Sequence, residues 1–137
     1  MRRLVLPLVL CLAGLSAAAQ SRTVWDKVYT EEQANRGETL YRQRCAQCHG
    51  DGLEGVEAAP ALTGPAFSDK WEGETLRALF DRMRTMPPDK PGVLSRAENA
   101  DVLAHLLRAG GFPSGDAPLD STAGALGEIT LRMYKPQ

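Results

Sequence analysis

The 137-residue chain has few of the residues that mark several common protein classes. It contains only three cysteines and two histidines, and its 16 Lys and Arg are balanced by 17 Asp and Glu. Nucleic-acid-binding proteins are expected to show a basic patch, so this balance argues against that class. The sequence also has no internal repeat, no dinucleotide-binding motif and no Walker motif.

The chain has only one long apolar run, Leu4–Leu15, which is too short to span a bilayer. Arg2 and Arg3 precede it and the small residues 17–19 follow it, which is the pattern of a secretory signal. We therefore expect residues 1–19 to be a signal peptide and the protein to be exported to the periplasm. An uncleaved membrane anchor is the alternative.

Removal of this segment near Gln20 also removes Cys11 and leaves a formal net charge of −3. Leu10 precedes Cys11, whereas lipid-modified cysteines usually follow a small residue, so we do not expect a lipoprotein. The two cysteines that remain lie in one short motif, and no disulfide is left to stabilise the fold.

That motif is Cys45-Ala46-Gln47-Cys48-His49, which has the C-x-x-C-H form of a c-type haem attachment site. Two cysteines at this spacing on a helix end can form thioethers with one edge of a porphyrin. The histidine that follows is then carried under the ring, where its imidazole can bind iron. The sequence therefore predicts one covalently attached haem c, held by Cys45 and Cys48, with His49 as the proximal iron ligand.

A C-x-x-C pair also occurs in zinc sites and in thioredoxin-like redox sites. Structural zinc uses four N or S ligands, and outside the motif this chain offers only Cys11 and His105. A thioredoxin-like pair requires a βαβ context, whereas this motif ends a helical pattern. Both alternatives are therefore weaker than haem attachment.

Three segments carry helix signals. Capping boxes at Thr30–Gln33 and Ser95–Glu98 predict helices over residues 31–45 and 95–108. An apolar stripe at three- and four-residue spacing predicts a helix over residues 74–84, with Trp71 just before it. Gly37 in the first helix and small residues in the third predict that these two helices approach closely.

The segment from Gly50 to Lys70 is rich in glycine and proline and is too long for an ordinary connector. We expect it to pack against the haem. The Pro60 carbonyl, eleven residues after His49, can accept the second ring proton of that histidine and fix its tautomer; alternatively, Pro60 only shapes the loop. Leu62, Phe67 and Trp71 are predicted to line the haem pocket.

Met86 precedes Pro87-Pro88, and a residue before proline is disfavoured in the helical conformation. We therefore expect Met86 to have left the helix, and we predict it as the distal iron ligand. Met83 continues the apolar stripe and is expected to pack in the core, although it stays an alternative ligand, as does Met133. His105 is predicted on the polar side of its helix, as a surface or helix-contact residue; the alternative is an iron ligand or proton-linked switch.

The order of these features resembles the class I c-type cytochromes over about residues 30–110. The stretches Ala-Pro-Ala-Leu-Thr-Gly-Pro, Leu-Phe-Asp-Arg-Met-Arg-Thr-Met-Pro-Pro and Gly-Phe-Pro-Ser-Gly are similar to small periplasmic monohaem cytochromes that accompany quinoprotein dehydrogenases. The resemblance implies an all-α cytochrome c fold, with three main helices and irregular loops wrapped around one haem. Residues 20–29 would be an extended lead-in, and residues 111–137 a tail that is packed on the domain or partly flexible.

In that family the methionine matching Met86 is the distal ligand and the carbonyl matching Pro60 contacts the proximal histidine. The helices matching residues 31–45 and 95–108 cross at the glycine matching Gly37. The sequence departs from the family at His105, where an aromatic residue is usual. Either His105 packs there uncharged, or Tyr41 takes over the work of the aromatic.

Iron held by His49 and Met86 has no free position for a substrate, so the sequence predicts an electron-transfer protein and not an enzyme. The resemblance implies redox protein partners, with a quinoprotein-type dehydrogenase as donor and a terminal oxidase as acceptor. No nucleic-acid partner and no stable membrane insertion after signal cleavage are expected. Two alternatives stay open: a ligand sensor or peroxidase-like protein with a labile methionine, and an electron-accepting subunit bound permanently to a dehydrogenase.

Overall fold

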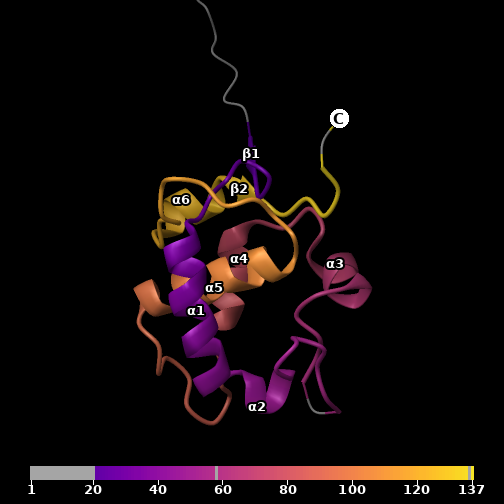
Figure 1. Ribbon diagram of the computed structural model, residues 1–137, viewed down its shortest axis with the longest axis vertical. Coiled ribbons are helices and arrows are strands. Elements are labelled where there is room, and N and C mark those ends of the chain that lie inside the picture. The colour runs from indigo at the N-terminus through magenta and orange to yellow at the C-terminus, as the bar shows by residue number, and fades with distance from the viewer. Residues whose placement is uncertain (1–20, 58, 136) are drawn as a thin grey trace, which may run out of the picture.

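The computed structural model describes residues 21–57, 59–135 and 137 (Figure 1). The predicted signal peptide, residues 1–19, lies outside the described residues. The described part is mainly helical. Its elements, in chain order, are β1 (Arg22–Thr23), α1 (Glu31–Arg44), α2 (Ala46–His49), α3 (Pro65–Trp71), α4 (Leu76–Met83), α5 (Arg96–Ala109), α6 (Ala123–Gly127) and β2 (Ile129–Thr130).

The three predicted helices correspond to α1, α4 and α5. The side chains of Thr30 and Ser95 each accept a hydrogen bond from the backbone N–H three residues further along the chain. The side chains of Gln33 and Glu98 in turn accept one from the backbone N–H of Thr30 and Ser95, so both capping boxes form. The prediction was wrong for the second half of the 50–70 segment, where Pro65 begins α3. This seven-residue helix escapes a periodicity search because it is short and buries no residue completely.

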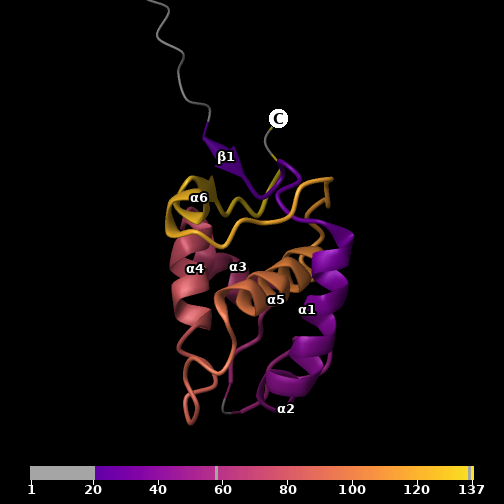
Figure 2. The same ribbon diagram turned by 90° about the vertical axis from the view of Figure 1, so that its left-hand side faces the viewer.

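Helices α1 and α5 lie across each other, with α5 in the middle of the molecule and α1 along one side (Figure 2). Gly37 is buried at the crossing, and a Cβ atom there would overlap the carbonyl oxygen of Asp101. Ala100 and Ala104 are buried on the facing side of α5. The predicted close approach is therefore confirmed, and it explains why glycine is kept inside a helix despite a cost of about 1 kcal/mol relative to alanine.

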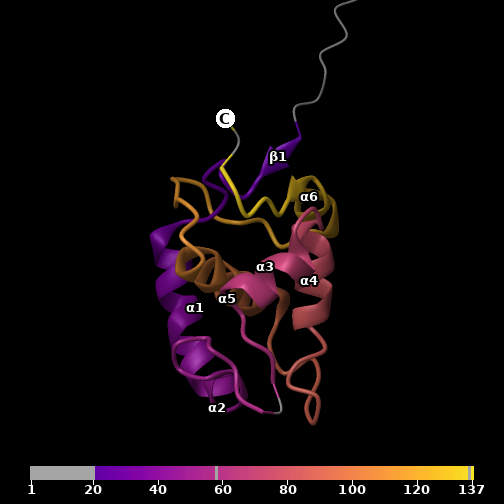
Figure 3. The ribbon, with the colours of Figure 1, turned by 90° about the vertical axis from the view of Figure 1, so that its right-hand side faces the viewer.

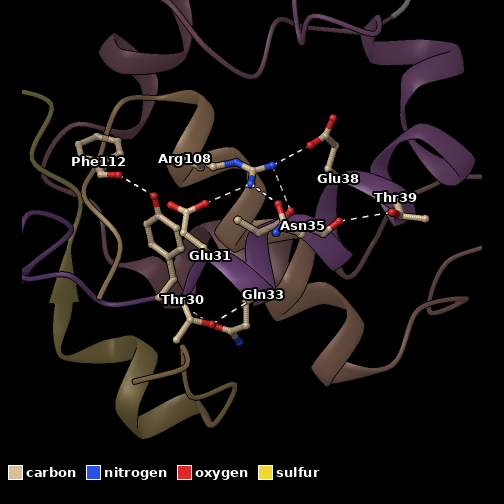
Figure 4. A network of polar contacts seen from close by, with 10 residues as sticks. Thr30, Glu31, Gln33, Asn35, Glu38, Thr39, Arg108 and Phe112 are labelled. Atoms are coloured by element: carbon tan, nitrogen blue, oxygen red, sulfur yellow. Dashed lines mark hydrogen bonds and ion pairs between the residues drawn. The ribbon is translucent and has the colours of Figure 1, made fainter. Parts of the chain in front are cut away.

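Charged side chains tie the two helices together at the edge of the crossing. The Arg108 guanidinium donates to Asn35 at 2.6 Å, to Glu38 at 2.8 Å and to Glu31 at 3.3 Å (Figure 4). About two turns earlier in α5, Asp101 accepts two hydrogen bonds from Arg36, both at 2.8 Å. Most of these side chains are partly exposed, so each ion pair contributes only modestly to the stability of the fold. Together the pairs help to fix how α1 and α5 are placed against each other.

The lead-in and the tail close the end of the fold opposite α2 (Figures 1 and 2). Strands β1 and β2 pair in parallel, and the Gln33 amide makes two hydrogen bonds to the backbone of Leu119. The tail residues Leu119, Leu126, Ile129 and Leu131 are buried together with Val24 and Val28. These tail residues therefore share one core with the helices.

Candidate haem site

The residues predicted to hold a cofactor meet in one cavity of about 460 Å³. This volume is within the range of cofactor pockets. The residues that line it come from α1, α2, α3, α4, α5 and the segments that follow α2 and α4. Figure 3 shows how these elements are arranged. The lining includes Cys45, Cys48, His49, Pro60, Leu62, Phe67, Trp71, Met83 and Met86. The cysteines, His49, Met86 and the four pocket residues predicted from the sequence therefore line the same cavity.

A single turn of helix presents the motif. Helix α1 ends at Arg44, and the carbonyl oxygen of Cys45 then accepts hydrogen bonds from the N–H groups of Cys48 at 3.1 Å and His49 at 2.9 Å. Gly50, at a φ of 82°, ends the turn. The Cys45 thiol is half-buried and that of Cys48 is exposed. Burial raises the pKa of the Cys45 thiol, with a smaller contribution from Cys48, so Cys45 is held in its neutral form.

The imidazole of His49 is oriented by the loop that follows. Its Nδ1 lies 2.7 Å from the Pro60 carbonyl oxygen, which can only accept a hydrogen bond. Nδ1 therefore carries the proton, and Nε2 keeps its lone pair, which is the form in which histidine binds a metal. Gly55, at a φ of 77°, lets the loop turn back, because a Cβ there would lie 2.6 Å from the Ala61 nitrogen.

Two methionines, Met83 and Met86, line the cavity. Helix α4 ends at Met83, and Met86 lies beyond it, with its N–H donating to the Met83 carbonyl at 2.9 Å. Met86 has left the helix, as the following proline predicted. Met83 also packs against the hydrophobic core. Met133 instead lines a separate cavity of about 90 Å³, so it is not placed with His49.

The prediction that His105 lies on a polar face was wrong. Its side chain is 8% exposed, because α5 is buried all round from Asn99 to Leu107 by α1 and the loops. Its ring lies 5.2 Å from that of Tyr41, and its Nδ1 has no hydrogen-bond partner among the described residues. Burial lowers the pKa of His105, and Arg108 and Arg42 add to this while Glu38 opposes it. An uncharged imidazole therefore packs at the crossing beside Tyr41.

This burial predicts a pH-dependent stability. The pKa of His105 is lower in the folded than in the unfolded chain, so the unfolded chain binds more protons and stability falls as pH drops below about 6.5. The His105→Phe variant should lose less stability between pH 8 and pH 5 than the wild type, by at most about 1.4 kcal/mol per pH unit. Urea unfolding of both proteins at each pH measures the difference. Parallel curves would contradict a buried neutral His105.

Sequence reasoning missed some of the cavity wall. Tyr41 is buried there, its hydroxyl donates to the Gly50 carbonyl at 2.6 Å, and burial raises its pKa to about 12. This bond connects α1 directly to the residue after His49. Val102 and Leu106 of α5 also line the cavity, and their four-residue spacing was the available signal. Arg44, Lys70 and Arg82 line it as well, and nothing in their spacing predicts this.

Residues 32–106 match the model of the family described as cytochrome c oxidase, cbb3-type, subunit III. The chain belongs to this family. It is a small c-type cytochrome, which confirms the resemblance seen in the sequence, and its domain binds haem c for electron transfer. The cytochrome is also similar to the crystal structure of the sulfane dehydrogenase SoxCD from Paracoccus pantotrophus, with a TM-score of 0.54 and 23% identity. That alignment covers 88% of this chain and 68% of the other, and it supports the fold.

The cavity of this cytochrome suits haem c in shape and in chemistry. Its wall is mostly apolar, it holds both thiols of the attachment motif, and the tautomer set by Pro60 leaves Nε2 of His49 free. A zinc site is less well supported, because no group of three or more His, Cys, Asp or Glu side chains is placed to hold a metal ion in the described residues. Within the same residues, no helix has the length and apolarity needed to cross a membrane.

Proposed function

We propose that this cytochrome is a monohaem electron carrier whose haem is held by Cys45 and Cys48, with His49 as the proximal iron ligand and Met86 as the distal one. The observation that carries the proposal is the convergence of all four side chains on one apolar cavity. Met86 is preferred to Met83 because Met83 also packs in the core, whereas Met86 stands on a turn before two prolines. Pro60, Leu62, Phe67 and Trp71 complete the pocket.

When bound, haem c supplies an iron that takes up and releases one electron. The chain's own residues set the conditions. The Pro60 carbonyl holds the Nδ1 proton of His49 and keeps the ring oriented in both redox states. The neutral thioether of Met86 and the apolar wall favour the ferrous over the ferric charge, which raises the reduction potential. Cys48 is exposed, so a redox partner can closely approach the edge of the haem that would be attached to it.

The proposed setting follows from the sequence and the comparisons. Residues 1–19 would be removed on export, and the cytochrome would work in the periplasm. The similarity to a sulfane dehydrogenase is consistent with a dehydrogenase as electron donor, and the oxidase in the family description with a terminal oxidase as acceptor. We propose a freely diffusing carrier. Size-exclusion chromatography of native extracts separates this from a permanently bound subunit.

Carbon monoxide tests the carrier against a ligand sensor. If Met86 stays on the iron, the reduced protein has no open position, and carbon monoxide at saturation should leave its absorption spectrum nearly unchanged at neutral pH. Met86→Ala serves as the matched positive control and should shift its spectrum readily. A wild-type spectrum that shifts as readily as that of the variant would contradict the carrier and favour a sensor with a labile methionine.

A further inference from the structure

Tyr41 connects the helix crossing to the turn that carries the attachment motif. Its ring belongs to a buried cluster whose other members are Leu53, Val102 and Leu106. The residue also lines the cavity that suits haem, and its hydroxyl donates to the Gly50 carbonyl oxygen at 2.6 Å. Gly50 follows His49 directly in the chain, so the hydroxyl holds the backbone one residue away from the proposed proximal ligand.

The hydroxyl of Tyr41 is not needed for packing. A phenylalanine ring would occupy the same space, whereas a buried hydroxyl costs free energy unless it has a hydrogen-bond partner. Tyr41 is only 1% exposed, and burial raises its pKa to about 12. The hydroxyl therefore stays protonated at neutral pH and acts as a permanent donor to the Gly50 carbonyl.

The Gly50 carbonyl is the first fixed point of the loop that returns to His49. The chain leaves α2 at Gly50, with a φ of 82° and a ψ of 152°. The same carbonyl oxygen accepts the N–H of Leu53 at 3.3 Å, and the carbonyl oxygen of Leu53 accepts the N–H of Leu62 at 2.9 Å. Leu53 has a φ of 63°, which is uncommon for a leucine, and through it the two ends of the loop are linked.

Pro60 lies in this closed loop, two residues before Leu62. Its carbonyl oxygen is 2.7 Å from Nδ1 of His49, so the strength of this hydrogen bond depends on the path of the loop. A strong bond from the Nδ1 proton makes Nε2 a more basic ligand, and a more basic ligand favours ferric iron. The path of the loop therefore bears on the reduction potential.

We propose that Tyr41 is a positioning residue for the proximal ligand, because its hydroxyl fixes the loop that holds the Pro60 carbonyl against His49. This inference rests on the proposed function, since it requires iron bound by His49. The hydroxyl acts through the backbone of Gly50 and the loop, without a bond of its own to the imidazole. Its removal loosens the Nδ1 hydrogen bond while the ring stays packed in its cluster.

The test compares Tyr41→Phe with Tyr29→Phe in the mature haem-loaded protein. The two tyrosines are closely matched, since each is 1% exposed and each donates to a backbone carbonyl at 2.6 Å, which for Tyr29 is that of Phe112. Tyr29 does not line the cavity. Each substitution removes one buried hydrogen bond, so the two variants should lose similar stability in urea. A purely structural role of Tyr41 predicts the same behaviour for both.

Proton exchange at the proximal histidine separates the two roles. The chain has two histidines, so isotope-labelled histidine gives a simple NMR spectrum of the ferrous protein. In Tyr41→Phe, the Nδ1 proton of His49 should exchange with solvent about tenfold faster, because the Pro60 carbonyl is held less firmly. The ratio of ferrous to ferric protein at a fixed applied potential should rise about threefold, since the ligand becomes less basic. Neither value should change in Tyr29→Phe.

Equal exchange rates and equal potentials in the two variants would overturn the proposal and leave Tyr41 as a packing residue. If Tyr41→Phe does not fold, ring-fluorinated tyrosine in the wild type keeps every hydroxyl and makes it a stronger donor. Of Tyr29, Tyr41 and Tyr134, only Tyr41 lines the cavity, so exchange at His49 should become slower. An unchanged rate would again overturn the proposal. A wild-type spectrum in which the His49 ring is not bound to iron would instead contradict the proposed function, so the two failures are distinguishable.

Discussion

Replacing Met86 by alanine is expected to lower the reduction potential of the haem by about 100 mV or more. The thioether is a neutral sulfur ligand that stabilises ferrous iron, and alanine leaves that position to water or to a harder ligand that favours ferric iron. Met86 is outside the helix and its side chain lines the cavity that also contains His49, so its removal changes the metal site without breaking a helix. Redox titration monitored by absorbance measures the shift.

Met83→Leu is the matched control for this experiment. Met83 lines the same cavity but packs in the apolar stripe of α4, and leucine keeps nearly the same volume there. The potential of this variant should stay close to that of the wild type. A large fall in Met83→Leu together with an unchanged potential in Met86→Ala would reverse the assignment of the distal ligand.

Loss of both attachment cysteines should abolish covalent haem and much of the folded state. In Cys45→Ser/Cys48→Ser, no thioether can form, and the cavity of about 460 Å³ is left without a tethered occupant. Without the haem, the mostly apolar wall of this cavity is left in contact with water, and the burial of that surface no longer stabilises the fold. The single variant Cys48→Ser should keep the haem by one thioether or fail to mature.

Haem that stays with the chain after denaturation and organic extraction measures attachment, and circular dichroism measures the fold. Gln47→Ala is the control, because it changes an exposed residue inside the motif without removing a thiol. It should retain haem like the wild type. Haem that still resists extraction from the double variant would show that these thiols are not the points of attachment.

The features predictable from the sequence were those with local signals. Capping boxes placed the starts of α1 and α5, the spacing of the motif placed Cys45, Cys48 and His49 together, and the proline after Met86 placed it outside α4. Each of these depends on residues a few positions apart. The contact between the Pro60 carbonyl and His49 was also predicted, because Pro60 follows the histidine by only eleven residues and a carbonyl there can accept its second ring proton.

The features that could not be predicted depend on partners far along the chain. His105 has polar neighbours in sequence, yet it is buried because α1 and Tyr41 cover that side of α5. The tail gave no periodic signal, and its order comes from Gln33, 86 residues before Leu119, and from the pairing of β2 with β1. The cations that line the cavity, Arg44, Lys70 and Arg82, come from three separate elements, so only the folded chain brings them together.

The absorption spectrum of the purified mature protein in both redox states tests the central claim most directly. With haem attached at Cys45 and Cys48 and iron between His49 and Met86, the reduced form should show the sharp bands of a six-coordinate c-type haem. The ferric form should show the weak charge-transfer band of sulfur ligation, and Met86→Ala should lose it. A colourless protein, or a ferric spectrum without that band, would contradict the account.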